Sequence, residues 1–253
     1  MSDQRNKPAV SMAEIKPELE RLHRRGFLRS TLSLGALTML TGYELSTHSG
    51  VDAALEAILR FDDRVQAALF SRQRLAETYP ASAITRPFRF NAYYAEWQVR
   101  PVPDNWVLSL GGGLVADRRP WTLQKLMALP QQGQITRHIC IEGWSQIGQW
   151  SGVPLGAFLR RVGADLSARY VHFKCFDGYS TSIDMASALQ PQTILALDFE
   201  EKPLAPQWGA PLRLRIPTKL GFKNAKNLEA IEVTNKYPGG YWENQGYDWF
   251  AGV

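Results

Sequence analysis

A cysteine and a group of cationic side chains are the residues of this chain best suited to chemistry. Cys140 ends a short apolar run where a strand is expected to enter a loop. A thiol at such a place can be a soft metal ligand, a nucleophile, half of a disulfide or a core residue, and the local pattern alone favours the last two. His138 and Glu142 flank it and could orient a ligand or relay a proton, although ordinary strand and loop polarity is the simpler interpretation.

The cationic group follows a predicted strand near the C-terminus. The run Leu212–Ile216 alternates apolar and basic residues, so Arg213 and Arg215 share one face. Pro217 then ends the pattern, and three lysines follow on the expected loop: Lys219, Lys223 and Lys226. Cations that converge where backbone N–H groups are exposed are typical of a phosphate site. A solvated basic strand edge explains the same pattern equally well.

Several short motifs, taken in order from Phe88 to the C-terminus, resemble those of one family. They are Asn91-Ala92-Tyr93-Tyr94, Cys140-Ile141-Glu142-Gly143-Trp144, Phe176 to Ser182, and Gly209-Ala210-Pro211-Leu212-Arg213. This order resembles the molybdopterin-binding oxidoreductase domain of the sulfite oxidase superfamily, and within it the catalytic subunit of bacterial protein-methionine-sulfoxide reductases. The resemblance implies an α+β fold with mixed β-sheets and flanking helices.

The resemblance also implies a role for each matching residue. Cys140 would be the thiolate that binds molybdenum beside the two sulfurs of one molybdopterin, and Asn91 and Tyr94 would contact the far end of the pterin. The pterin and its phosphate would be held by Arg213, Asn224, Ala225 and Lys226. Cys175 and Trp208 stand at pterin-contacting positions where the reductase has Thr and Asn. Because such differences alter the pocket that sets specificity, they leave the substrate open.

The expected enzyme transfers an oxygen atom with a two-electron change. Reduction of a sulfoxide, of the protein methionine sulfoxide kind, is the first choice, and sulfite oxidation is the alternative. The chain contains no Cys-x-x-Cys-His haem attachment motif, so electrons are expected from a partner. The resemblance implies a membrane-bound b-type cytochrome. A competing interpretation pairs Cys140 with Cys175 in a disulfide, which would give an exported binding domain without a metal.

The N-terminus predicts export from the cytoplasm. Arg24 and Arg25 precede a mostly apolar run, Leu28–Leu40, which is too short for an ordinary membrane span. This order is typical of a signal read by the twin-arginine translocase, which carries folded, cofactor-loaded proteins. The sequence therefore predicts a periplasmic protein. The signal is either cut at a weak site or kept as an uncleaved anchor.

Composition and patterning predict a globular chain with three parts. Of 253 residues, 45% are hydrophobic and 21% charged, and the net charge of +5 is too small to indicate nucleic-acid binding. Residues 1–50 are expected to be export signal and linker, residues 51–80 an amphipathic helix, and residues 81–253 the molybdopterin-binding domain. The apolar stripe of the helix is expected to pack on the domain, with docking on a membrane partner as the alternative. A monomer is expected.

Overall fold

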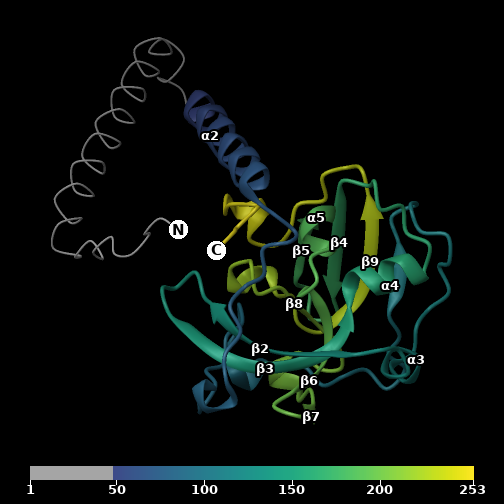
Figure 1. Cartoon of the computed structure of the whole chain (residues 1–253). Coiled ribbons are helices and arrows are strands. Elements are labelled where there is room, and N and C mark those ends of the chain that lie inside the picture. Colours follow the sequence, from purple (N-terminus) through teal and green to yellow (C-terminus); the bar gives the residue numbers. More distant parts are fainter. Residues whose placement is uncertain (1–47) are drawn as a thin grey trace, which may run out of the picture. The chain divides into compact units, whose positions relative to one another are not determined.

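The computed structural model describes residues 48–253 (Figure 1). The arginine pair and the apolar run expected for export lie outside the described residues. The chain divides into two units, residues 1–58 and 59–253, and the first is described only from His48, where helix α2 (His48–Leu69) begins. Across residues 48–253, no helix combines the length and the apolar character that crossing a membrane requires.

The larger unit contains a four-stranded sheet and a five-stranded sheet (Figure 1). The first has the order β1 (Ser109–Gly111), β9 (Leu228–Thr234), β4 (Tyr170–Cys175) and β5 (Ser180–Asp184). Strand β1 runs parallel to β9, and the other pairs are antiparallel. The sheet is therefore mixed, and one end of it carries the tight β4–β5 hairpin.

The five-stranded sheet is antiparallel throughout. Its main path is β2 (Gln132–Ile139), β3 (Ser145–Pro154), β6 (Ile194–Phe199) and β7 (Lys202–Pro203), and β8 (Arg213–Arg215) also pairs with β6. Gly152 lies where the β3–β6 register shifts. A Cβ atom at Gly152 would lie 2.0 Å from the carbonyl oxygen of Leu195, so only glycine fits this close approach.

Helices are short in this unit. They are α3 (Leu123–Met127), α4 (Leu155–Arg161) and α5 (Met185–Ala188), with 3-10 turns η1 (Ala81–Ala83), η2 (Glu96–Gln98), η3 (Pro206–Trp208), η4 (Gly221–Lys223) and η5 (Glu243–Gln245). The sequence pattern predicts a helix over Leu155–Val162, and this helix forms as α4. The pattern also predicts a helix over Ile183–Leu189, but the helix that forms is shorter, because Ile183 pairs with Val171 in the sheet and Asp184 caps α5. One mixed sheet and one antiparallel sheet, with few helices, confirm the α+β class.

Two hydrophobic clusters form the core. The larger joins both sheets to α4 and includes Leu108, Phe158, Phe173, Leu214 and Ile231. The smaller packs on the five-stranded sheet around Trp150, Ile194 and Phe199. The larger cluster thus packs the two sheets against each other, and this packing holds their hairpins in place.

Helix α2 ends at Leu69 instead of continuing toward residue 80. The prediction that its apolar stripe packs on the domain is wrong for Val65 and Leu69, which are exposed. The second half of α2 instead contacts the C-terminal segment through polar groups. Asp63 accepts the N–H of Phe250 at 2.7 Å, and Gln66 accepts that of Gly252 at 3.0 Å. Since each residue advances 100° around a helix, these contacts lie on a different face from the stripe.

Candidate functional site

A pocket of about 300 Å³ lies where the tips of two hairpins meet. The turn between β2 and β3 supplies Cys140 and Ile141, and the turn between β4 and β5 supplies Asp177 and Tyr179. Residues 89–94 and the loop that follows β8 complete the lining. The volume is at the lower end of the range for small-molecule sites, roughly 300–1,000 Å³.

Cys140 is the first residue of the β2–β3 turn. Its N–H donates to the carbonyl of Trp144 at 2.9 Å, and its own carbonyl accepts from Gly143, whose φ is 86°. The positive φ explains the glycine at this position of the turn. Cys140 is 8% exposed and lines the pocket, and burial raises the pKa of its thiol. Both cysteines are free, so the competing interpretation, a disulfide between Cys140 and Cys175, is wrong.

Lys226 places a buried cation in the same pocket. Its Nζ donates to the carbonyls of Asn91 and Gln207 and lies 4.4 Å from the centre of the Phe90 ring. Across the described chain, no carboxylate lies within 4.0 Å of Lys226. Burial lowers its pKa well below the usual value. A buried ammonium with only carbonyl partners is suited to an anionic ligand.

His138 and Asn91 form a polar contact beside the pocket. The Asn91 amide donates to His138 Nε2 at 3.2 Å. His138 is buried, and burial lowers the pKa of its imidazole, so the ring is neutral. Gly221 lies against it, since a Cβ atom there would be 2.7 Å from His138 Nε2. Two pocket segments, those of Asn91 and Gly221, therefore contact the same His138 ring.

Arg213 and Arg215 are buried, so the alternative interpretation, a solvated basic strand edge, is wrong. Arg213 donates to the carbonyl of Trp208 at 2.9 Å, and Arg215 donates to the side-chain oxygen of Asn224 at 2.9 Å. Arg215 also donates to Thr136 Oγ1 of β2 at 3.0 Å. Neither arginine lines the pocket. Both instead hold its wall, the loop that contains Asn224, against the five-stranded sheet.

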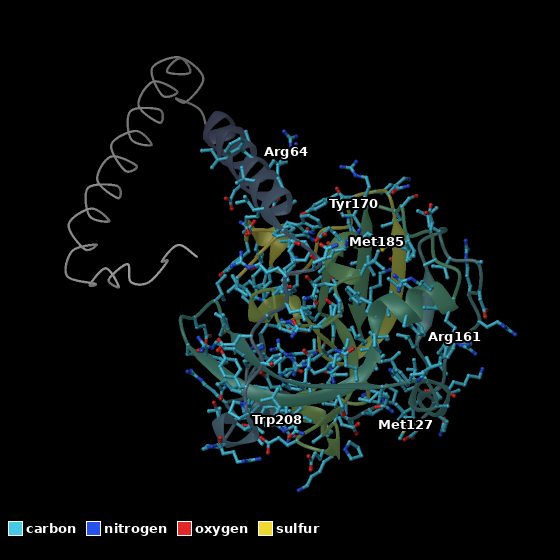
Figure 2. The ribbon with its side chains drawn as sticks, in the orientation of Figure 1. Arg64, Met127, Arg161, Tyr170, Met185 and Trp208 are labelled. Carbon is cyan, nitrogen blue, oxygen red and sulfur yellow. The ribbon has the colours of Figure 1, made fainter. Side chains whose placement is uncertain are left out.

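The structure brings most of the predicted site residues together. Six of them line the pocket: Asn91, Tyr94, Cys140, Asn224, Ala225 and Lys226. Arg213, Cys175 and Trp208 do not. Cys175 belongs to the larger core cluster, and Trp208 packs on Phe88 and Phe199 beside the five-stranded sheet (Figure 2).

Of the three lysines expected to converge, only Lys226 reaches the pocket. Lys219 donates to the carbonyl of Phe250 at 2.7 Å, and Lys223 is paired with Glu243. The expected phosphate-binding group of three lysines is therefore wrong for Lys219 and Lys223. Each compensates its burial with partners elsewhere in the domain.

Asp177 is a pocket residue to which the sequence assigned no role. Its Oδ2 accepts the Tyr94 hydroxyl at 3.2 Å, and its Oδ1 accepts the N–H of Tyr179 at 3.0 Å. Burial raises the pKa of the Asp177 carboxyl, which favours its protonated form. The available signal was the Asp177-Gly178-Tyr179 triplet, because an acid in a tight turn presents its side chain at the tip of a hairpin.

Aromatic side chains form much of the remaining wall. They come from separate segments and comprise Phe90, Tyr93, Tyr94, Tyr179, Phe222, Trp242 and Tyr247. Tyr179 donates its hydroxyl to the carbonyl of Phe222 at 2.6 Å, which links the β4–β5 turn to η4. The pocket thus combines one thiol, the buried Lys226 ammonium, the Arg89 guanidinium, the carboxyl groups of Glu142 and Asp177, and a broad aromatic surface.

The fold and this pocket define an α+β domain with a cavity suited to an anionic ligand beside a buried thiol. A family profile described as "Oxidoreductase molybdopterin binding domain" matches residues 96–242. The chain belongs to this family, so it is an oxidoreductase with a molybdopterin-binding domain, and the expected membership of the sulfite oxidase superfamily is confirmed. The residues present fit that ligand, because the thiol suits a soft metal and Lys226 suits an anion.

Proteins with similar sequences support the same family. A protein of Azospira oryzae with the provisional name protein-methionine-sulfoxide reductase subunit YedZ1 is 55% identical over 90% of this chain and 87% of its own length. The protein-methionine-sulfoxide reductase catalytic subunit MsrP of Xanthomonas axonopodis is 32% identical over 58% of this chain and 52% of its own. MsrP of Ralstonia nicotianae is 34% identical over 57% and 47%. The chain thus spans about half the length of these two MsrP proteins.

A solved structure supports the fold. The sulfane dehydrogenase SoxCD of Paracoccus pantotrophus superposes with a TM-score of 0.51, at 18% identity, over 55% of this chain and 40% of that one. At this identity the likeness concerns the fold alone. It agrees with the α+β arrangement of one mixed and one antiparallel sheet described above.

Proposed function

We propose that this protein is an exported molybdenum–molybdopterin oxidoreductase that reduces a sulfoxide. The observation that carries the proposal is that the Cys140 thiol and the Lys226 ammonium line one pocket of about 300 Å³. The names of the Azospira and Xanthomonas relatives support the sulfoxide. When bound, the cofactor supplies the two-electron exchange of an oxygen atom.

The chain's own residues hold the cofactor in this proposal. Cys140 provides the thiolate ligand of molybdenum. The positive charge of the metal would favour the thiolate and so oppose the effect of burial, which raises the pKa of the thiol. Lys226, together with Asn224 and Ala225, contacts the pterin and its phosphate. Asn91 and Tyr94 bind the other end. Arg213 and Arg215 act through Asn224, to which both donate hydrogen bonds.

The pocket surface favours a sulfoxide over sulfite. Sulfite is a small dianion and would need several cations, whereas the lining has only Arg89 and Lys226 among many aromatic rings. Aromatic rings pack well against the sulfur and the methyl group of a methionine-like side chain. An organic sulfoxide bound to a peptide or a small molecule therefore fits the lining better.

Asp177 serves as the proton donor in this proposal. Removing the oxygen of a sulfoxide consumes two electrons and two protons and yields a sulfide and water. Asp177 is suited to take up and donate a proton, since burial raises the pKa of its carboxyl, and it lines the same pocket as Cys140. Solvent returns the proton to Asp177 and supplies the second one.

Export and an electron partner belong to the same proposal. The twin-arginine sequence at Arg24 and Arg25 supports transport of the folded, cofactor-loaded protein to the periplasm. Electrons would come from a membrane-bound b-type cytochrome. Fractionation of cells into cytoplasm, membrane and periplasm, compared with an Arg24→Lys/Arg25→Lys variant, tests the location. A variant that reaches the periplasm as well as wild type would contradict it.

The deciding experiment measures molybdenum in protein produced with active pterin biosynthesis. Near-stoichiometric molybdenum is expected in wild type, with lost metal or an altered molybdenum spectrum in Cys140→Ser. The loaded enzyme is then assayed with methionine sulfoxide and a reduced dye, and with sulfite and an oxidised dye. Faster sulfite oxidation would select the alternative function, and folded protein without molybdenum would overturn the whole proposal.

A further inference from the structure

An exposed apolar row runs along the second half of α2. Phe61, Val65 and Leu69 are 66%, 38% and 79% exposed. Their spacing of four residues places them on one face of the helix. Leu75, in the segment that follows, is 57% exposed. Single exposed apolar residues are common on soluble proteins, but a row of large ones marks an interaction surface.

The row continues into a groove of about 710 Å³. Leu69 belongs to both, and Phe70, Leu75, Ile139, Phe250 and Val253 give the groove an apolar lining. The groove shares no lining residue with the Cys140 pocket. Arg137 and Ile139 of β2 line the groove, whereas Cys140 and Ile141 of the turn after β2 line the pocket. The two cavities are therefore separate sites on the same domain.

Cations border this apolar surface. Arg64, Arg72, Arg74 and Arg137 are all exposed, and Arg64 projects from α2 in Figure 2. For the residues that the structure describes, none of the four has a carboxylate within 4.0 Å. Two exposed acids, Asp62 and Glu77, lie in the same segment, where they accept hydrogen bonds from Gln66 and Tyr79. Because four arginines stand against these two carboxylates, the border of the surface carries a net positive charge.

We propose that residues 61–75, with the adjoining groove, bind the surface of an anionic phospholipid bilayer. An interfacial helix has an apolar face of large residues beside basic ones, which is the arrangement of Phe61 and Leu69 beside Arg64. Phe61, Leu69 and Leu75 enter the boundary between headgroups and acyl chains, and Arg72 and Arg74 contact lipid phosphates. This contact is additional to the export signal and independent of the cofactor.

Hydrogen exchange read by mass spectrometry on the full chain tests this proposal. The peptide-level readout separates residues 59–76 from the apolar run at 28–40, which can bind lipid by itself. Vesicles of phosphatidylcholine with phosphatidylglycerol are expected to slow exchange in peptides from 59–76 severalfold. Vesicles of phosphatidylcholine alone are expected to have a much smaller effect, because they lack the anionic charge.

Variants locate the contact. The double variant Leu69→Glu/Leu75→Glu is expected to abolish the protection. Arg72→Gln and Arg74→Gln are each expected to weaken vesicle binding roughly fivefold, measured as the lipid concentration at which the protection appears. Met127→Glu is the matched control, since Met127 is 51% exposed on α3 (Figure 2). It should leave the protection unchanged.

Three outcomes would overturn the proposal. The first is exchange in 59–76 that neither kind of vesicle changes. The second is protection that survives the double glutamate variant. The third is protection by native membranes that protein-free vesicles of the same lipids do not reproduce, which would assign the surface to a membrane protein instead.

Discussion

Lys223 and Glu243 form an ion pair whose two side chains are both fully buried. Their chain neighbours Phe222 and Trp242 line the Cys140 pocket, so the pair joins two of its walls from behind. Thr181 of β5 donates its hydroxyl to the same carboxylate. Burial lowers the pKa of Lys223, and the charge of Glu243 opposes that effect. Each charge therefore depends on the other to remain in the interior.

The pair predicts a strong coupling in stability. Lys223→Met leaves Glu243 as a buried charge without a partner and is expected to lower the free energy of unfolding by about 3–5 kcal/mol. The double variant Lys223→Met/Glu243→Gln removes both charges and is expected to be clearly more stable than the single one. Guanidinium denaturation of the single and double variants measures the coupling. Strictly additive losses would show that the two charges do not depend on each other.

Replacement of Lys226 should separate stability from cofactor binding. Lys226 is a desolvated cation with only carbonyl partners, so Lys226→Met is expected to keep or raise the stability of the cofactor-free protein. Molybdenum and pterin content should fall sharply, because the pocket loses its buried cation. Lys219→Met is the matched control, as Lys219 is also buried but bonds to Phe250 away from the pocket. Equal cofactor loss in both variants would contradict a specific role for Lys226.

Gly221 predicts a steric effect on the pocket. A methyl group there would lie 2.7 Å from His138 Nε2, so Gly221→Ala must displace His138 or η4 and disturb the Asn91 contact. Reduced cofactor content is expected in a protein that still folds. Gly133→Ala is the control on β2, because nothing lies within 4 Å of a Cβ atom at that position. Unchanged cofactor content in Gly221→Ala would show that the ring does not define the pocket.

The sequence predicted those site residues that belong to short motifs of neighbouring residues. Cys140 and the Asn224–Lys226 segment belong to ordered motifs, and each motif falls at a strand end or loop. Alternation along Leu212–Ile216 correctly placed Arg213 and Arg215 on one face, but it carries no information about what covers that face. Thr136 of β2 and the Asn224 loop cover it. Those partners are distant in sequence, so their contacts appear only in the folded chain.

Long-range pairing also explains the early end of α2. The segment after Leu69 has no proline until Pro80, and local pattern favoured a longer helix. In the structure Thr78 forms an antiparallel β-bridge with Thr136, and the Tyr79 N–H donates to the carbonyl of Ile135. The free edge of β2 thus draws this segment into an extended form, which overrides helix propensity.

Asp177 predicts the pH dependence of sulfoxide reduction. Burial raises its pKa, and only the protonated form donates, so the rate is expected to fall as pH rises through that pKa. The Tyr94 hydroxyl lowers the pKa by bonding to the carboxylate, and Tyr94→Phe should therefore shift the fall to higher pH. The Asp177→Asn enzyme should reduce sulfoxide more slowly, and its rate should no longer fall as pH rises through this range. If the rate of the Asp177→Asn enzyme still falls with rising pH, another group donates the proton.

Asp63 predicts how stability depends on pH. Burial and its bond to Asp248 raise the pKa of Asp63 to about 7, against 3.8 as the ordinary value. The folded state therefore holds a proton that the unfolded state has released between these values. The stabilisation is complete below the ordinary value and is lost as pH rises through about 7. Thermal unfolding across this range should show falling stability.

Substitution of Asp63 supplies the decisive comparison. Asp63→Asn keeps a side-chain oxygen for the N–H of Phe250 and removes the titrating group, so the decline toward pH 7 should flatten. Asp62→Asn, at the adjacent exposed position, should keep the wild-type slope. If Asp63→Asn declines as steeply as wild type, another group titrates in this window. A flattened profile would instead identify the Asp63–Asp248 pair as a proton-dependent link between α2 and the C-terminal segment.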